Sequence, residues 1–428
     1  MMLLKSFFSA IIFDICLSCS CMAEQVTDVS RLSLQQAIDI AMKHNHDLQL
    51  SRNAIDTAAA AGLIAGASPN PSLTLQSISI NPKEGIGPGT LSRKTIDSAI
   101  RVDQLIERGG KRELRREAAA RLEDAARADK SDTVRQVRVT VSQAYYDLLA
   151  FEERLNILNQ NAAFYDSSVS AAQKRQSAGD LAIADLARLQ LDALRVKNDV
   201  RQAEADVMKA RQSLAILLGK LNLASHIKLA DTWPSFPSKF AEPPSSLIDR
   251  RPEVLAARAR LDAAIAARKL ALASRSRDIS VGVQYDHYPT SQTNTQGTGN
   301  SFGVFVQIPL FINHHYEGDI RTAELAVDTA TVTLEKTRDL ASNEISQNWQ
   351  DVLTSFELLQ RYDDSLLIAA KKSADAAEFA FKHGAIGIMD VLDTRRTYKT
   401  IQLDALSARS VHAKSLAAWQ ATQLENIQ

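Results

Sequence analysis

Two aspartates near the C-terminus, Asp390 and Asp393, have a spacing that suggests a function. Residues three positions apart lie on the same face of a helix. If that face lined a passage shared by three chains, the two positions would form two stacked rings of carboxylates, which attract cations, repel anions and narrow the passage. Arg395 and Arg396 follow closely, so ordinary solvated helix surface is the alternative interpretation.

A third acid, Asp185, shows that this region is one half of an internal repeat. The turn Ala178-Gly179-Asp180 and the turn His383-Gly384-Ala385 lie about 205 residues apart, and Asp185 follows the first turn as Asp390 follows the second. At a similar interval, residues 45–48 align with 251–254. Solenoid units run roughly 20–50 residues, so this longer period indicates a duplicated half-domain. We expect a first repeat over 24–220, an irregular linker over 221–245 and a second repeat over 246–428.

Two long segments predict very long helices, because the first contains no proline and no internal glycine and the second is nearly the same. Residues 110–178 and 316–383 each correspond to about 100 Å of helix at 1.5 Å per residue. Four shorter helices are expected to lead back, at 34–67, 180–219, 246–274 and 388–423.

Alternating segments precede each long helix and predict four strands. The pairs are 73–80 with 95–104, and 279–286 with 302–310. Such alternation over about ten residues is typical of membrane strands, although a soluble hairpin with one buried face shows the same pattern.

Bulk composition narrows the function classes. The 428 residues carry 50 basic and 50 acidic side chains that are interleaved, which gives no basic patch for nucleic acid. Aromatic residues are only 6%, as expected for long helices packed through small side chains.

The N-terminus predicts export. Residues 1–23 combine Lys5, an apolar stretch and the small residues Cys21 and Ala23, which together resemble a signal peptide. Cys16, Cys19 and Cys21 are the only cysteines, so a processed chain would hold no disulfide and no catalytic thiol. An N-terminal membrane anchor is the alternative, which the short length disfavours. Lipidation of Cys19 or Cys21 is a further alternative.

The remaining residues suggest neither a metal centre nor a catalytic site. His44 and His46 point apart on a helix, and His314 and His315 are adjacent, so neither pair has the spacing of a metal site with further ligands. No nucleophile with a partner base and no phosphate-binding loop is present. We therefore expect no cofactor.

A single chain cannot complete the predicted fold. A helical hairpin of this length leaves its apolar stripe exposed, and four strands leave two open sheet edges, which lipid does not tolerate. Three chains would solve both problems. We therefore expect a mainly α fold with a membrane β part, in which a homotrimer forms a 12-stranded β-barrel and a long helical tunnel.

Several short motifs make the chain resemble the outer-membrane efflux (TolC-like) family over residues 24–428. They are the runs 105–112 (Leu-Ile-Glu-Arg-Gly-Gly-Lys-Arg) and 308–311 (Ile-Pro-Leu-Phe), and the tip segments 178–182 and 383–386. The Glu-Arg-Gly-Gly-Lys-Arg run resembles the branch that serves cobalt-zinc-cadmium and related heavy-metal pumps. Residues 313–318 depart from the family's usual Asn-Gln-Gly.

This resemblance implies an exit duct in the outer membrane that extends into the periplasm. Its partners would be outer-membrane lipid, a periplasmic adaptor and an inner-membrane pump of the proton-driven resistance-nodulation-division type, and its cargo would be heavy-metal cations. The family's tunnel gate uses aspartates near the tip, which implies gate roles for Asp390, Asp393 and Asp185. Six tip residues would contact the adaptor: Gly179, Asp180, Leu181, Gly384, Ala385 and Ile386.

Three alternatives remain open at the level of sequence. The duct could serve drug efflux or type I secretion, or the chain could be a soluble periplasmic coiled-coil adaptor or scaffold. An adaptor should carry Gly-rich β domains around a single helical hairpin, whereas this sequence predicts two hairpins.

Overall fold

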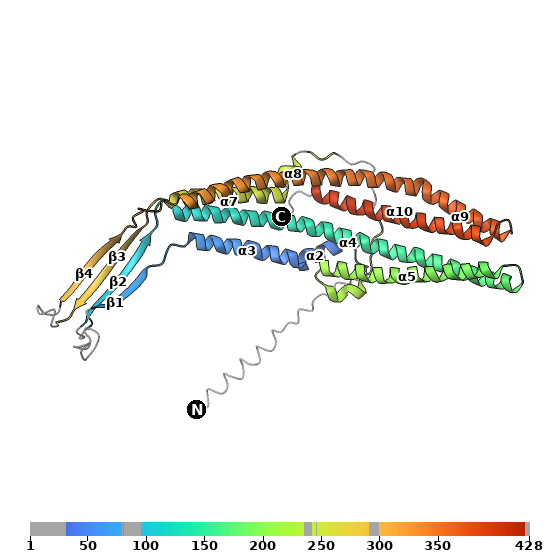
Figure 1. Cartoon of the computed structure of the whole chain (residues 1–428), viewed down its shortest axis with the longest axis horizontal. Helices are drawn as coiled ribbons and strands as arrows, with labels where there is room; N and C mark the ends of the chain where they lie inside the picture. Colours follow the sequence, from blue (N-terminus) through green and yellow to red (C-terminus); the bar gives the residue numbers. More distant parts are fainter. Residues whose placement is uncertain are drawn as a thin grey trace, which may run out of the picture.

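The computed structural model describes residues 31–78, 80, 96–234, 242–244, 246–290 and 299–423. The molecule is elongated, with a four-stranded sheet at one end and the tips of two helical hairpins at the other (Figure 1). The element order, two helices, two strands, a long helix and a return helix, occurs twice along the chain. The expected targeting segment and all three cysteines lie outside the described residues.

The single helix predicted over 34–67 is wrong, because the structure interrupts it at Asn45. Helix α2 (Leu34–His44) begins at a capping box formed by Ser33, and helix α3 (His46–Gly66) follows after one extended residue. No proline or glycine marks this break, which is why the apolar periodicity runs through it.

Asn45 itself accounts for the break. Its side-chain oxygen accepts hydrogen bonds from the backbone N–H groups of Asp47 (2.8 Å) and Leu48 (3.3 Å). Its Nδ2 donates to the carbonyl oxygen of Leu217 at 2.9 Å. Asparagine is favoured at this position because it satisfies backbone donors that the start of a helix leaves free.

The helix predicted over 246–274 is interrupted at the equivalent place. Helix α6 (Leu247–Arg250) ends at Arg251, whose backbone is extended, and helix α7 (Pro252–Ala273) starts with proline at its first position. Proline fits there because the missing N–H is not needed in the first turn.

The long helices agree with the prediction except for one local feature. Helix α4 (Lys111–Ser177) is continuous over 67 residues. Its counterpart consists of α8 (Glu317–Arg361), a five-residue π-helical segment η4 (Tyr362–Leu366) and α9 (Leu367–Lys382). Such π segments occur as single-turn bulges inside helices and are common at functional sites.

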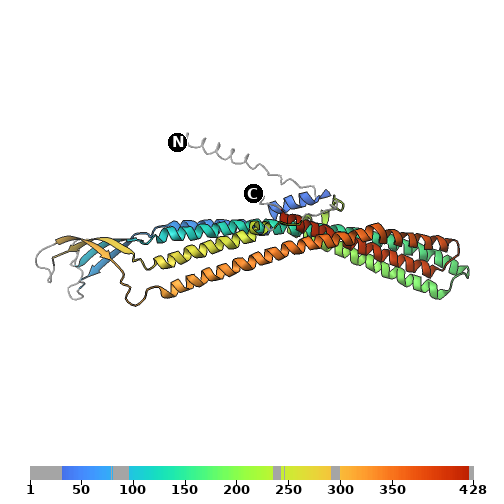
Figure 2. The same cartoon turned by 90° about the horizontal axis from the view of Figure 1, so that it is seen from above.

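Two return helices complete the hairpins, α5 (Ile183–Leu217) and α10 (Ile388–Gln423). Near the sheet, α3, α4, α7 and α8 lie side by side in that order (Figure 1), and each contacts the next. Toward the tips, α4 packs on α5, and α9 packs on α10 (Figure 2). None of the described helices combines the length and the apolar character needed to cross a membrane.

The four strands form one antiparallel sheet in the order β1-β2-β3-β4, which is also their order along the chain. Their bounds are β1 Ser72–Ile78, β2 Asp97–Ile106, β3 Ile279–Tyr288 and β4 Gly299–Gln307. Strands β1 and β4 are the edges, and neither has a further partner in the described chain.

The main core lies halfway along the molecule, where α2 and the short 3-10 helix η3 (Leu221–His226) cover α4 and α5. Tyr145 is fully buried there, and its hydroxyl donates to the carbonyl oxygen of Leu32 at 3.0 Å. Leu32 bridges in parallel to Leu229. The described part of the predicted irregular linker is therefore held against the helices at this level.

Candidate functional site

One face of the sheet is an exposed apolar band. Across the four strands, Leu73 pairs with Val102, Val102 with Val283, and Val283 with Val304. The next row of the same face contains Leu75, Ile100, Tyr285 and Phe302. Phe302 leaves 85% of its surface exposed. An apolar face this large is normally covered by protein or lipid, and the alternation of faces is that of membrane strands.

The opposite face of the sheet is polar and carries a built cluster. Arg101 pairs with Asp103 at 2.7 Å and lies over the ring of Phe305, 4.3 Å from its centroid. Gly282 provides the room, because a Cβ there would lie 2.2 Å from a carboxylate oxygen of Asp103. Thus the predicted alternation of the strands corresponds to two chemically distinct faces.

The turn from β2 into α4 explains the glycines of the Glu-Arg-Gly-Gly-Lys-Arg run. Gly109 and Gly110 both adopt left-handed backbone conformations, with φ of 75° and 68°. A Cβ on Gly109 would also lie 2.8 Å from the Cβ of Ser276. Left-handed conformations cost little for glycine and more for other residues.

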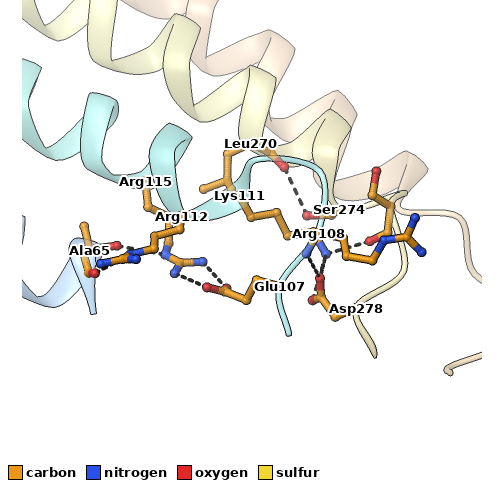
Figure 3. A network of polar contacts seen from close by, with 11 residues as sticks. Ala65, Glu107, Arg108, Lys111, Arg112, Arg115, Leu270, Ser274 and Asp278 are labelled. Carbon is orange, nitrogen blue, oxygen red and sulfur yellow. Dashed lines mark hydrogen bonds and ion pairs between the residues drawn. The ribbon is translucent and has the colours of Figure 1, made fainter. Parts of the chain in front are cut away.

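The charged residues of the same run hold the sheet to the helices (Figure 3). Lys111 Nζ lies 2.9 Å from both carboxylate oxygens of Asp278, and Arg115 pairs with Glu107 through Nη2 at 2.8 Å. Arg112 Nε donates to the carbonyl oxygen of Gly66 at 2.6 Å. Hydrogen bonding from Arg115 lowers the pKa of Glu107. At the level of sequence the run is only a family marker. In the structure it connects β2, α3 and Asp278, the residue before β3, to the start of α4.

Both hairpin tips turn through glycine in the same way. Gly179 and Gly384 have φ of 84° and 75°, and the next residues, Asp180 and Ala385, donate to carbonyl oxygens five residues earlier at 2.9 and 2.8 Å. This is a Schellman-type helix end. Both glycines are exposed, as are Asp180 and Ala385, while Ile386 is half-buried.

Leu181 differs from the other predicted contact residues. It packs against the hydrophobic cluster that closes the tip, together with Ile388 and Met389. Part of its surface is therefore already used within the chain.

Two of the acidic residues lie beside the second tip, in the first turns of α10. Asp390 and Asp393 are exposed on α10, while Val391 and Leu392 between them are buried. One oxygen of Asp390 accepts the backbone N–H of Gly387 at 3.2 Å, so this carboxylate also caps the helix start. Asp185 is half-buried at the equivalent position of α5.

A set of contacts that the sequence did not reveal joins the two hairpins near the tips. Arg396 on α10 forms an ion pair with Asp192 on α5, close to Tyr165 on α4. Lys399 pairs with Asp199 at 3.5 Å. Burial raises the pKa of Tyr165, although Arg396 opposes this effect. The sequence offered Arg396 only as a neighbour of the acids, because its partners are about 200 residues away.

The histidines named above do not converge. Among the described residues, no group of three His, Cys, Asp or Glu side chains could hold a metal ion. His412, which the sequence did not single out, is fully buried on α10, with Nδ1 2.9 Å from the hydroxyl of Ser355. Burial lowers its pKa to about 4.

Comparison with known proteins identifies the family. The sequence profile of the outer membrane efflux proteins matches residues 37–220 and 244–421, which is most of the chain. The chain belongs to the outer membrane efflux protein family.

Individual relatives agree with this assignment. The cobalt-zinc-cadmium resistance protein CzcC of Cupriavidus metallidurans is 26% identical over 382 residues, covering 86% of this chain and 84% of the relative. The pyoverdine export outer membrane protein OpmQ of Pseudomonas putida is also 26% identical, over 91% of this chain and 86% of the relative. The Campylobacter jejuni CmeC outer membrane channel has the same fold, with a TM-score of 0.76 at 17% identity over 91% of this chain and 85% of that one.

Family membership confirms the fold class, the resemblance and the cellular location predicted from sequence. This outer membrane efflux protein is a channel component of tripartite pumps rather than an enzyme. It resides in the outer membrane and extends into the periplasm, where such channels work with an adaptor and an inner-membrane transporter. The alternative of a soluble adaptor or scaffold is therefore wrong.

Proposed function

We propose that this outer membrane efflux protein forms a homotrimeric exit duct that passes heavy-metal cations. The observation that supports the trimer best is the sheet itself. It has an exposed apolar band on one face, a polar face opposite, and two unpaired edges, β1 and β4. Joining β4 of one chain to β1 of the next would close a twelve-stranded barrel from three copies.

The helices have matching open edges. In the row α3-α4-α7-α8, the outermost helices carry exposed leucine, isoleucine and valine side chains, and these are Leu50, Leu63 and Ile64 on α3 and Leu325, Val332 and Leu340 on α8. Burying such side chains stabilises an assembly by about 25 cal/mol per Å² of apolar surface. A cyclic trimer brings α8 of one chain against α3 of the next.

Cysteine cross-linking tests this arrangement. All native cysteines lie within residues 1–23, so no native thiol would contribute to cross-linking in the processed chain. The test variant combines Leu63→Cys with Leu325→Cys. We expect a short bifunctional thiol reagent to yield dimers and trimers of the double variant in membranes. The matched control combines Leu63→Cys with Leu194→Cys, an exposed position on α5 near the tip. Equal cross-linking of both pairs, or none of either, would argue against the trimer.

The acidic tip is the proposed selectivity element. In a trimer, Asp390 and Asp393 would contribute two rings of three carboxylates at the periplasmic entrance, and Asp185 a third. The adaptor would be met by the exposed tip residues Gly179, Asp180, Gly384 and Ala385, together with the half-buried Ile386 and the remaining surface of Leu181. The ion pair of Arg396 with Asp192 would hold the two hairpins together when the entrance is closed.

The choice of cargo rests on the relatives. CzcC is a cobalt-zinc-cadmium resistance protein, which supports metal cations as the cargo. The partner pump that we propose is of the proton-driven resistance-nodulation-division type. OpmQ, at the same identity, is a pyoverdine exporter, which supports export of small organic molecules as the second candidate. An acidic entrance favours the cationic cargo. Drug efflux and type I secretion remain further options for the same duct.

Deletion of the gene in its native host separates these cargoes. We expect lower tolerance of cobalt, zinc and cadmium, restored by the wild-type gene. Retained metal tolerance together with accumulation of a siderophore in the periplasm would favour the organic cargo instead.

The Arg396→Ala variant tests whether the ion pair with Asp192 restrains the entrance. Expressed in the deletion strain, it should restore metal tolerance but make the cells more sensitive to large antibiotics.

A further inference from the structure

A basic cavity of about 680 Å³ lies where the second repeat is interrupted, between α3, α4, the α6–α7 junction and the end of α10. Its wall carries six cations and a single carboxylate, Asp249, and the cations are Arg127, Lys130, Arg135, Arg138, Arg250 and Arg251. A cavity of this size is within the range of small-molecule sites.

Arg251 is the most buried of these cations, with 3% of its surface exposed. Its guanidinium pairs with Glu253 at 2.6 Å and with Glu344 at 2.8 Å. Its Nη1, however, is buried without a hydrogen-bond acceptor among the described residues. Leaving a buried charged donor unsatisfied costs more than leaving a neutral one, so such a group normally has a partner.

Unlike Arg251, two other cations of the wall have no ion-pair partner within the described chain. Lys130 and Arg138, both half-buried on α4, form no ion pair there, and the Nε of Arg138 is buried without an acceptor. By contrast, Arg127 pairs with Glu123, and Arg135 pairs with Asp132 and Glu344. The positive charge that the described chain leaves without an ion pair is therefore concentrated on Lys130 and Arg138, beside the unsatisfied Nη1 of Arg251.

The equivalent place in the first repeat is filled by the protein. There Asn45 replaces Arg251, and its amide is satisfied by Leu217 at the end of the return helix. Gly219, two residues after Leu217, packs directly against the backbone of His44, because a Cβ on this glycine would lie 2.2 Å from the carbonyl oxygen of His44. In the second repeat the end of the return helix, 421–423, lines the cavity instead.

We infer that this cavity is a binding site for a small anion carrying carboxylate or phosphate groups. Arg251, Arg138 and Lys130 would donate charge-assisted hydrogen bonds to it, and Arg is well suited to bidentate contact with either group. A bound anion would tie α4 to the α6–α7 junction at mid-length, beside the end of α10. This inference depends on neither the trimer nor the cargo.

Isothermal titration of the purified full-length protein in detergent, at low ionic strength, tests the site with two probes, inorganic phosphate and succinate. We expect saturable binding of one anion per chain. The probe that binds more tightly shows whether the site prefers phosphate or carboxylate groups. Lys130→Gln and Arg138→Gln should each weaken binding about tenfold or more, because a hydrogen bond to a charged group contributes about 1.5–3 kcal/mol. Arg138→Lys should retain part of the affinity.

Arg121→Gln is the matched control, because it removes the same charge from an exposed position of α4 outside the cavity. It should leave the affinity unchanged. The inference is overturned if neither probe binds saturably to folded wild-type protein, or if Arg121→Gln weakens binding as much as the cavity variants. Circular dichroism of each variant ensures that a loss of binding is not a loss of fold.

Discussion

The two repeats share their order of elements but differ at three equivalent places. At the strand-to-helix turn, the first repeat has Gly110, whereas the second has Tyr316 in the same left-handed conformation, with φ of 64°. At mid-length, the first repeat has the satisfied Asn45, whereas the second has Arg251 beside a basic cavity.

The third difference lies in the hairpins. The long helix of the first repeat is uninterrupted, but that of the second contains the π-helical segment 362–366. Facing this region, His412 on α10 is buried against Ser355, where the first repeat has the buried Val207 on α5. At both interior places the second repeat therefore buries a side chain that can carry a charge, whereas the first repeat buries an amide or an apolar side chain.

This difference shows how a duplicated fold can divide its roles. Both halves must supply strands and tunnel wall, so their backbone plans remain alike. The polar groups concentrated in the second half cost stability unless they are satisfied, and such groups are retained most often where they serve binding or movement. Substitutions at the equivalent positions measure this asymmetry directly.

The largest effect is expected at mid-length. Arg251→Ala would leave Glu253 without its buried partner and should destabilise the fold by about 3 kcal/mol, at the low end for a buried pair because Glu344 is 42% exposed. Asn45→Ala should cost about 1–2 kcal/mol, as for the loss of a helix cap. Denaturant unfolding of both variants, monitored by circular dichroism, gives the two losses in the free energy of unfolding. A greater loss for Asn45→Ala would reverse the proposed asymmetry.

The next effect depends on pH. Burial keeps the folded pKa of His412 at about 4, below its ordinary value of 6.5. Above about pH 6.5 the imidazole is neutral in both the folded and the unfolded chain, so it does not oppose folding. As the pH falls from 6.5 toward 4, the unfolded chain binds a proton that the folded chain does not, and the free energy of unfolding decreases. The folding equilibrium should weaken by about tenfold per pH unit within this window.

His412→Val, which introduces the residue of the first repeat, should remove this part of the pH dependence. Thermal unfolding midpoints of the two proteins between pH 4 and pH 7 provide the measurement. Parallel curves for wild type and variant would show that His412 is not the group responsible.

At the tips, the effect is on ion passage rather than on folding. Asp390→Asn with Asp393→Asn should reduce the preference for cations severalfold in planar bilayers, because neutral rings no longer attract them. Asp185→Asn in the first repeat should change the selectivity much less, because that side chain is half-buried and has no acidic neighbour three residues later. Equal effects of the two changes would mean that both repeats line the entrance alike.

The smallest effect is expected at the strand-to-helix turns. Gly110→Ala should destabilise the protein by about 1 kcal/mol, since a side chain is disfavoured in the left-handed conformation. Tyr316→Gly should be close to neutral, because relief of the backbone is offset by lost contact with the rings of Phe311 and His314. Thermal unfolding of both variants tests the contrast, which fails if Tyr316→Gly proves the more destabilising.

Local pattern determined much of this protein. The near absence of proline and glycine predicted the long helices, the period-two alternation predicted four strands, and the glycines at 179 and 384 predicted the tips. These features are encoded by neighbouring residues, so they can be read along the chain. The spacing of Asp390 and Asp393 likewise places both on one exposed helix face, whereas their role as a gate stays a prediction.

Tertiary structure decided the features that join distant residues. The Asn45 amide depends on the carbonyl of Leu217, and the Arg396 ion pair depends on Asp192. The cavity around Arg251 depends on α3, α4, the α6–α7 junction and the end of α10. Each partner lies far away in sequence, and nothing in local periodicity specifies it. Whether a polar residue is satisfied, exposed or left beside a cavity is settled only when the packed helices bring these partners together.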